Sequence, residues 1–440
     1  MCALGIPDLR VVQNNISYND SRGVTRGIHA EPWDKFISVA RGSVFGAWVD
    51  LREGSATYGR VYTCTLDPSK AIYVPRGVGN SFQALEDGTA YTYLVDAHWS
   101  LELKKTYTFV NLADPELAIE WPIPLDEATV SEADKNHPML RDVVPMAPRR
   151  TLVTGCNGQL GHAVCRLAEE RGVAKDFDFC DIDTFDMSDP DAYTQYDWSL
   201  YGTVINCGAY TAVDRAETPE GRATAWKANA TGPALLARTC AEHGITLVHV
   251  SSDYVFDGTA HLPYTEDAPT APLGVYGRTK LAGERAVAES GCKYLTFRTA
   301  WLYSEYGHNF LKTMLRLTSE RDTLQVVFDQ IGTPTYAGDL ALAIFSLIET
   351  GRYAGNEGVY HFTDEGVCSW YDFAVEIAAA AGHGTCRIIP CHTSEYPTKA
   401  QRPAYSVLDK TKIKTTFQMD IPHWREALIY CMKRLTENNP

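Results

Sequence analysis

The sequence lacks the long apolar runs that membrane helices need. Nowhere in its 440 residues do about 18 apolar residues follow one another, and the N-terminus MCALGIPDLR has neither the basic start nor the apolar stretch of a signal peptide. An excess of positive charge is also missing, because 55 Asp and Glu outnumber 40 Lys and Arg and give a net charge of -15. Nucleic acid and anionic membrane surfaces both attract positive charge, so we expect neither as a partner. The sequence predicts a soluble, cytoplasmic protein.

Clustered cysteine and histidine are absent from the sequence as well. The twelve Cys lie scattered from Cys2 to Cys431 without a C-x-x-C pair, and several fall inside apolar, strand-like runs. This pattern indicates reduced core thiols in a cytosolic protein rather than a disulfide framework. The twelve His are dispersed too, so the sequence predicts no metal site.

The chain divides into two halves with different hydrophobic periodicity. Residues 10–122 form short alternating segments rich in Val, Tyr, Phe and Thr, separated by Gly, Pro or Asp turns, a pattern typical of an antiparallel β-barrel or jelly roll. After the linker PMAPRR at 145–150, apolar runs alternate with helical segments, as in a parallel sheet flanked by helices. We therefore predict two unlike domains, 1–146 and 147–440.

A glycine-rich turn opens the second domain. The strand-like run 151–154 leads into GCNGQLG at 155–161 and then into a helical segment. Such a turn lets the backbone approach a pyrophosphate and directs helix N–H groups at it, and the spacing G-x-x-G-x-x-G is that of short-chain dehydrogenases. The residues of this turn predicted to bind a dinucleotide are Gly155, Asn157, Gly158, Gln159, Leu160 and Gly161.

An acidic residue follows the second strand of this domain. Asp181 lies about 20 residues past the last glycine, where a carboxylate would accept hydrogen bonds from the adenosine ribose hydroxyls. This favours NADH over NADPH. The alternative is that Asp181 is a solvated loop carboxylate, because Asp183 and Asp186 crowd the same loop. The other residues predicted beside the cofactor are Asp186 and Met187 at the adenine, and Cys207, Gly208 and Ala209 after the third strand.

A Ser, a Tyr and a Lys follow in the order that a carbonyl reductase needs. Ser252 ends a strand, and Tyr276 and Lys280 stand four residues apart on a predicted helix, hence on one face. Hydride delivery to a ketone leaves an alkoxide that needs a proton, and a nearby ammonium would lower the pKa of a phenol that supplies it. We predict Tyr276 as proton donor, Lys280 as that ammonium and as a ligand of the nicotinamide ribose, and Ser252 as the group that polarises the carbonyl.

Residues 150 to about 435 resemble the dTDP-4-dehydrorhamnose reductases, which are extended short-chain dehydrogenases of Rossmann type. The matching stretches are TGCNGQLG, NCGAYTAVDRAE, SSDYVFDG, PLGVYGRTKLAGE, FRTAWLY with NFLKTML, DQIGTPT and QRPAYSVLD. The resemblance implies that Trp301, Asn309 and Arg402 line a nucleotide-sugar pocket. A buried aromatic, a turn Asn and a surface Arg are the respective alternatives.

Residues 10–142 resemble, more distantly, the dTDP-4-dehydrorhamnose 3,5-epimerases, which are cupin-like jelly rolls. The matching stretches are VVQNNIS, TRGIHAE, VARGSVFGAWVDLREGSATYGR, IYVPRGVGNSF, YTYLVDAHWS, LAIEWPIP and VSEAD. The resemblance implies a base His29 held by Asp134, and an acid Tyr93. Further residues that it implies are Arg26 and Lys35 at the diphosphate, and Gln13 and Asn15 at the nucleotide base. Taken alone, His29 could equally be a structural histidine in a strand.

This half departs from the epimerase pattern in several places. Gly79-Asn80-Ser81-Phe82 stands where the family usually has an Ala-His-Gly-Phe-like turn, and His98-Trp99 stands where it has a Tyr-Tyr pair. The loop between His29 and Lys35 is short. The family's first few dozen residues, with a strand that commonly pairs with a partner subunit, are expected to be missing before Met1. These departures leave the trio intact and affect substrate grip and dimer geometry.

Three hypotheses follow from the sequence. The first is a bifunctional enzyme, expected as a homodimer, that converts dTDP-4-dehydro-6-deoxyglucose to dTDP-L-rhamnose with NADH or NADPH. The second keeps the reductase and makes the barrel a structural or dimerisation module. The third is a non-catalytic binding protein that retains the nucleotide fold, since fold does not imply function.

Overall fold

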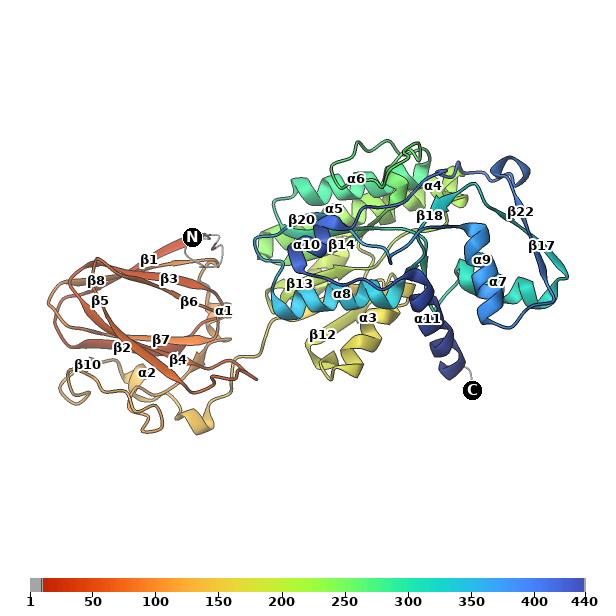
Figure 1. The fold of residues 1–440 in the computed structure, drawn as a ribbon. Helices are drawn as coiled ribbons and strands as arrows, with labels where there is room; N and C mark the ends of the chain where they lie inside the picture. Colours follow the sequence, from red (N-terminus) through yellow and green to blue (C-terminus); the bar gives the residue numbers. More distant parts are fainter. Residues whose placement is uncertain (1–8, 10, 439–440) are drawn as a thin grey trace. The chain divides into compact units, whose positions relative to one another are not determined.

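The computed structural model describes residue 9 and residues 11–438. It divides into two compact units, 1–148 and 149–440 (Figure 1), where the sequence predicts a boundary at 146. The expected absence of a signal peptide concerns residues 1–10 and so falls almost wholly outside the described residues. No helix among the described residues is long and apolar enough to cross a membrane.

The N-terminal unit consists of two facing β-sheets. The first sheet has the order β1 (Gln13–Asn19), β8 (Thr89–Val95), β3 (Lys35–Arg41) and β6 (Ala71–Val74). The second has the order β10 (Thr129–Val130), β2 (Val24–Ala30), β7 (Val78–Ala84), β4 (Val44–Asp50) and β5 (Val61–Leu66), and β9 (Thr108–Phe109) pairs with β2. Short helices α1 (Leu101–Lys104) and α2 (Glu132–Lys135) and the turn η2 (Leu140–Asp142) complete the unit. This confirms the predicted jelly-roll class.

Strand alternation gives the second sheet two buried faces. Side chains such as Trp48 and Phe82 point toward the first sheet, where they form one cluster with Ile37 and Tyr91. The opposite face, which includes Ile28, packs against the chain that follows β9. Because inward and outward residues alternate along a strand, each polar residue of β2 can be assigned to one face or the other.

The C-terminal unit is built on a parallel sheet. The order is β12 (Phe177–Cys180), β11 (Arg150–Thr154), β13 (Tyr201–Asn206), β14 (Thr246–Ser252), β15 (Lys293–Thr299) and β20 (Gly358–His361). All five neighbouring pairs are parallel, which confirms the predicted α/β class. The strand order reverses between β11 and β13, and ligands bind beyond the carboxyl ends of strands at such a switch point.

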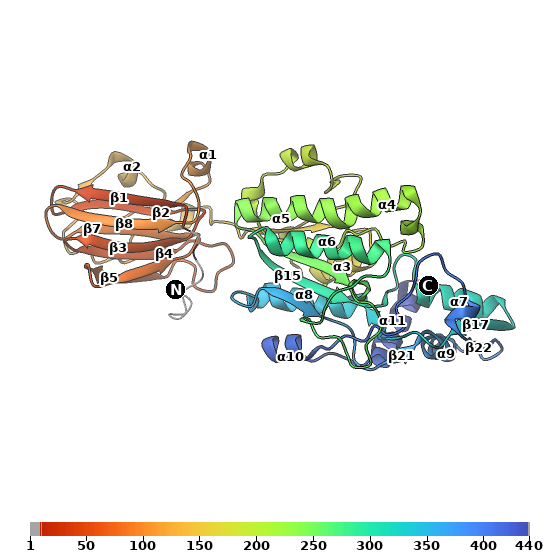
Figure 2. The same cartoon turned by 90° about the horizontal axis from the view of Figure 1, so that it is seen from above.

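Helices cover both faces of this sheet (Figure 2). On one face pack α3 (Gln159–Glu170) and α8 (Ala337–Thr350); on the other pack α5 (Gly232–His243) and α6 (Val275–Glu289). A smaller part has its own core, and includes α7 (Phe310–Glu320), α9 (Trp370–Ala380) and α11 (Trp424–Asn438) with the strand pairs β16 (Leu302–Tyr303)–β19 (Thr335–Tyr336), β17 (Thr323–Val327)–β22 (Arg387–Cys391) and β18 (Ile331–Gly332)–β21 (Cys368–Ser369).

Short elements join these layers. They are η3 (Ala174–Asp176), η4 (Pro190–Gln195), η5 (Trp198–Leu200), η6 (Arg215–Glu217), α4 (Pro219–Trp226), the π-helical η7 (Lys227–Thr231), η8 (Asp253–Val255), η9 (Thr393–Glu395) and α10 (Thr411–Phe417).

Candidate active sites

The glycine-rich turn joins β11 to α3 and has no room for a side chain at Gly155 or Gly161. Gly155 has a φ of +66°, and a Cβ there would lie 2.5 Å from the Cα of Gly208 after β13. A Cβ on Gly161 would clash with the carbonyl oxygen of Gly155, and Gly158 is the N-cap residue of α3. The backbone therefore forms a cradle at the switch point that fits a pyrophosphate, and the exposed Asn157 lies in it.

The predicted ribose and adenine residues lie at the same edge of the sheet. The Asp181 carboxylate, at the end of β12, accepts hydrogen bonds from the backbone N–H of Asn157 at 2.8 Å and of Ile182 at 2.7 Å. Asp186 instead accepts from the backbone and hydroxyl of Ser188, both at 2.8 Å, so its side chain organises its own turn.

The small residues after β13 complete this edge. A Cβ on Gly208 would lie 3.2 Å from the Met187 side chain, and the Cys207 N–H donates to the Thr154 carbonyl at 3.1 Å. Ala209 is exposed. Leu160, predicted at the cofactor, is buried in the core beneath the turn.

Ser252, Tyr276 and Lys280 come together as predicted, at the end of β14 and in the first turns of α6. The Ser252 side chain lies close enough to the Tyr276 phenol to act on its pKa. The Ser252 hydroxyl donates to Asp253 at 2.7 Å, and the Lys280 ammonium donates to the Val250 carbonyl at 2.6 Å. Burial lowers the pKa of Lys280 to about 8.

The predicted lowering of the Tyr276 pKa by Lys280 is wrong for this structure. Burial and the Asp253 carboxylate raise the pKa of Tyr276 to about 12. The ammonium that should oppose them lies on the Val250 carbonyl. At neutral pH the phenol is therefore protonated and can act as a donor.

Two residues beside the triad were assigned no role from the sequence. Asp253 is buried, and burial raises its pKa to about 6. The Tyr254 ring meets the Tyr276 ring edge to face, with centroids 5.3 Å apart. Both follow Ser252 directly in SSDYVF, so their position along the strand end was the available signal.

The residues predicted to line the sugar pocket have different environments. Arg402 donates to Asp214 at 2.7 Å, and its charge acts on the Tyr254 phenol, which places it near the triad. The Trp301 ring stacks on Trp370, with centroids 3.6 Å apart and planes at 10°.

Both polar groups of the Asn309 side chain form hydrogen bonds within the protein. Its side-chain oxygen accepts from the Lys312 N–H as the N-cap of α7, and its amide donates to Gln159 at 2.9 Å and to the carbonyls of Ser304 and Tyr306. The structure thus favours the turn alternative for Asn309, which ties the glycine-rich turn to α7.

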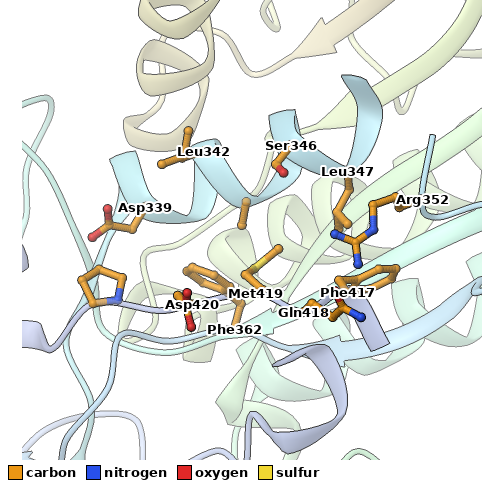
Figure 3. A pocket seen from close by; sticks show the side chains of 12 residues that line it. Asp339, Leu342, Ser346, Leu347, Arg352, Phe362, Phe417, Gln418, Met419 and Asp420 are labelled. Atoms are coloured by element: carbon orange, nitrogen blue, oxygen red, sulfur yellow. The ribbon is translucent and has the colours of Figure 1, made fainter. Parts of the chain in front are cut away.

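A pocket of about 250 Å³ lies elsewhere in the same unit (Figure 3). It is bounded by α8, with Asp339 and Leu342, and by the chain after α10, with Met419 and Asp420. None of the residues predicted for a site lines it, so the chemistry of the triad does not reach this pocket.

In the barrel, a β-bulge turns both Arg26 and His29 inward. Arg26 and His29 are three residues apart, so in a regular strand their side chains would point to opposite faces. However, Arg26 pairs with Phe82 and His29 with Asn80, so β2 holds one residue more than β7 between these pairs. Gly27, at the bulge, has a φ of +119°, and a Cβ there would lie 2.5 Å from the Cβ of Ser81.

The structure brings His29 and Asp134 together. The His29 Nε2 lies 2.8 Å from an Asp134 carboxylate oxygen. Burial alone would raise the pKa of Asp134, but the hydrogen bond and charge of His29 outweigh it and hold this pKa below its usual range. A carboxylate only accepts, so Nε2 carries the proton of this hydrogen bond, and in the neutral imidazole Nδ1 has the lone pair that can receive a proton.

Tyr93 lies on the inner face of the opposite sheet. Burial and the Glu31 carboxylate raise its pKa to about 12, against the charge of Arg26. The Lys35 ammonium lies 5.5 Å from the centre of the Tyr93 ring and forms an ion pair with Glu31. Lys35 is therefore buried beside the phenol, deeper than a diphosphate ligand at the surface would be, whereas Arg26 is exposed.

Gln13 and Asn15 lie on the same inner face. Asn15 stands opposite Tyr93 in the antiparallel pair of β1 and β8, and such partners share a face. The Gln13 amide donates to the Asn15 oxygen at 2.7 Å. Six of the seven residues predicted for the barrel site thus lie on the inner faces of the two sheets. The seventh, Asp134, contacts His29 of β2.

Comparisons with known proteins found relatives of both units. Residues 149–437 match the family described as RmlD substrate binding domain, and residues 1–142 match the family described as dTDP-4-dehydrorhamnose 3,5-epimerase. The chain is 40% identical over 303 residues to a dTDP-4-dehydrorhamnose reductase of Burkholderia thailandensis, a match that covers 65% of this chain and 99% of that protein.

Matches were also found among solved structures. A crystal structure of dTDP-4-dehydrorhamnose reductase from Bacillus anthracis in complex with NADP is 36% identical, with a TM-score of 0.60, over 65% of this chain and 99% of that one. RmlC from Streptococcus suis, in complex with dTDP-D-xylose, is 59% identical over 31% of this chain and 69% of that one, with a TM-score of 0.29. On the family matches and the reductase relatives, the chain belongs to the RmlD substrate-binding family, with an N-terminal unit of the dTDP-4-dehydrorhamnose 3,5-epimerase family.

Proposed function

We propose that the chain epimerises dTDP-4-dehydro-6-deoxyglucose at C3 and C5 and then reduces the product to dTDP-L-rhamnose with NADH or NADPH. The observation that carries this proposal is that each unit holds its own set of proton-transfer groups. In the barrel, the His29 Nε2 lies 2.8 Å from an Asp134 carboxylate oxygen. In the α/β unit, Tyr276 and Lys280 share the first turns of α6, and Ser252 acts on the Tyr276 phenol. Joining the two steps makes chemical sense, because the epimerised ketone is an equilibrium species that reduction traps.

In the barrel, His29 and Tyr93 divide the proton transfers. Asp134 holds the imidazole by Nε2, so Nδ1 removes the proton from the carbon beside the carbonyl. Tyr93, whose pKa of about 12 keeps it protonated at neutral pH, returns a proton from the other face. The buried Lys35 ammonium stabilises the negative charge that develops on the sugar oxygen. Arg26, exposed at the mouth, holds the diphosphate.

In the α/β unit, the cradle of glycines fits a dinucleotide, which supplies hydride when bound. Ser252 polarises the carbonyl and Tyr276 delivers the proton to the alkoxide oxygen. Lys280 positions the nicotinamide ribose. Arg402 and the Trp301–Trp370 stack contribute to holding the nucleotide sugar.

The pH dependence of reduction should follow Lys280. Burial lowers its pKa to about 8, so its ammonium is present below that pH and is lost as the pH rises through it. We expect kcat/KM for reduction of already epimerised substrate to be flat near pH 7 and to fall about tenfold per pH unit well above pH 8. A rate unchanged to pH 10 would contradict a role for the charged lysine.

Asp181 should set the choice of cofactor. Its carboxylate would accept from the ribose hydroxyls of NADH and repel the phosphate that NADPH carries there. Asp181→Ala should therefore raise the KM for NADH more than the KM for NADPH. Asp183→Ala, in the same loop, is the matched control. It should change neither the KM for NADH nor the KM for NADPH. Equal losses for both cofactors would make Asp181 a loop residue only.

The decisive test of the proposed function is the product formed from dTDP-4-dehydro-6-deoxyglucose. The full-length enzyme with NADH or NADPH should yield dTDP-L-rhamnose, identified by NMR and mass spectrometry. Consumption of reduced cofactor only with substrate that another enzyme has epimerised would favour the second hypothesis, in which the barrel is structural.

We also propose a homodimer in the cytoplasm. Support for a dimer comes from β1, an edge strand whose outer face exposes Ile16 by 66% and Tyr18 by 56%. An exposed, apolar edge strand is a template for pairing with another chain. Sedimentation of the full chain tests the dimer.

All eleven cysteines in the described residues are unpaired, which suits the reducing environment of the cytoplasm.

A further inference from the structure

A second imidazole lies beside the His29–Asp134 pair. The Nε2 of His137 is 3.9 Å from the same Asp134 oxygen that receives His29. The two imidazole rings meet edge to face, with centroids 5.3 Å apart. One ligand atom from each of the three residues lies within 4.8 Å of the others, a grouping of His, Cys, Asp or Glu found at no other place in the part of the chain that the structure describes.

These three side chains are built into the fold. Asp134 belongs to α2, whose N-cap Ser131 accepts the Asp134 N–H at 3.1 Å. The Asn111 amide donates to the carbonyls of Lys135 and His137, each at 2.9 Å, and so fixes the segment that carries His137. His137 also stacks on Phe109, with centroids 4.7 Å apart. The cluster is therefore held by tertiary contacts rather than by chance proximity on a mobile surface.

The burial and charge of the cluster suit a cation. The side chains of Asp134 and His137 are 6% and 12% exposed, whereas that of His29 is 31% exposed and leaves a route for an ion. The Nε2 atoms of both imidazoles face the same Asp134 carboxylate oxygen, at 2.8 Å for His29 and 3.9 Å for His137.

Two imidazoles and one carboxylate form a donor set for Zn²⁺ and its neighbours in the transition series. Zinc sites with three protein ligands use His and carboxylate at about 2.0 to 2.2 Å and leave one position open for solvent. Ligand atoms already within 4.8 Å of one another need only small side-chain rotations to reach such bonds. Softer metals that prefer thiolates are disfavoured, because the cluster has no sulfur.

We propose that His29, Asp134 and His137 form a binding site for Zn²⁺, and that the bound ion switches off the proposed epimerase. The second part rests on the proposed function, the first does not. When Nε2 of His29 binds the metal, its proton moves to Nδ1. The ring then has no lone pair for a substrate proton, and Asp134 no longer holds it. Metal and epimerisation therefore compete for the same imidazole.

Metal binding is tested on the metal-free full-length protein without substrate. Titration with Zn²⁺ in a calorimeter should show one tight site, and Co²⁺ should produce the visible absorption of a low-coordinate site. His137→Asn should weaken Zn²⁺ binding at least about tenfold, because loss of even a hydrogen-bonding partner of a ligand costs that much. His261→Asn, at an exposed histidine of the other unit, is the matched control and should leave the affinity unchanged.

His137→Gln serves as a second variant. Thermal melts are used to check that both variants are folded. Equal Zn²⁺ affinity in the wild type and both folded His137 variants would overturn the site, as would the absence of a tight site in the wild type.

Inhibition is tested by solvent deuterium entering the keto-sugar without reduced cofactor. Zn²⁺ should slow this exchange in the wild type, a chelator should restore it, and His137→Asn should need about tenfold more Zn²⁺ for the same inhibition. Reduction of already epimerised substrate, run in parallel, should be unaffected. Equal sensitivity of the wild type and His137→Asn would overturn the switch. Absence of exchange in the metal-free wild type would instead refute the proposed epimerase and leave the binding titration to decide the site.

Discussion

Replacing Tyr276 by Phe should stop reduction while leaving cofactor binding intact. The ring, which packs edge to face against Tyr254, remains, and only the proton donor is lost. Loss of a positioned general acid lowers kcat by about 10² to 10⁴. Steady-state oxidation of NADH or NADPH with already epimerised substrate measures the rate, and quenching of protein fluorescence by the cofactor measures binding.

Tyr294→Phe is the matched control for this variant. Tyr294 lies near the start of β15, whereas Ser252 and the other reacting groups lie beyond the carboxyl ends of the strands. Its loss of a phenol hydroxyl should leave kcat within a factor of about two, as for a substitution outside the site. Near-normal turnover by Tyr276→Phe would show that another group delivers the proton, and the triad assignment would be wrong.

The sequence was sufficient for features that depend on local pattern. A short apolar strand, a glycine-rich turn and a helix are contiguous, so the cradle of Gly155 and Gly161 could be placed without tertiary information. The same holds for Tyr276 and Lys280, which share a helix face by spacing alone. Both folds were also within reach, because alternation with period two and strand–helix alternation separate the classes.

Features that depend on register or on tertiary contact were out of reach. Regular alternation puts Arg26 and His29 on opposite faces, and only the bulge in β2 brings both inward. The sequence did not predict His137 as a site residue. It stands three residues after Asp134, but its position beside Asp134 also depends on the hydrogen bond that Asn111, distant in the sequence, donates to its carbonyl. Two of the histidines that are dispersed in the sequence, His29 and His137, are neighbours in the fold.

Chemical environment was equally hidden. The sequence suggested that Lys280 lowers the pKa of Tyr276, but the direction depends on burial and on Asp253, which raise it. Asn309 was placed in the sugar pocket by resemblance, yet in the fold its amide group caps α7 and bonds to Gln159. A cap can be read from sequence only when the start of the helix is already known.

Replacing His29 by Ala should abolish the exchange of solvent protons into the keto-sugar. If His29 is the base and Tyr93 the acid, incubation in heavy water without reduced cofactor introduces deuterium at C3 and C5, since each abstracted proton is replaced from solvent. The imidazole lies 2.8 Å from Asp134 and faces the interior with Tyr93. We expect exchange, followed by NMR, to fall by about 10² or more.

The reductase site supplies the control for this experiment. Each unit has its own core, and substitutions in distant sites act nearly independently. His29→Ala should therefore still reduce substrate that another enzyme has epimerised, and Tyr276→Phe should still exchange deuterium at the wild-type rate. His29→Ala should lose only the exchange and Tyr276→Phe only the reduction. Misfolding of the whole chain would abolish both steps and cannot produce this pattern. Deuterium entering equally fast with wild type, with His29→Ala and without enzyme would refute the epimerase and leave the barrel as a structural module.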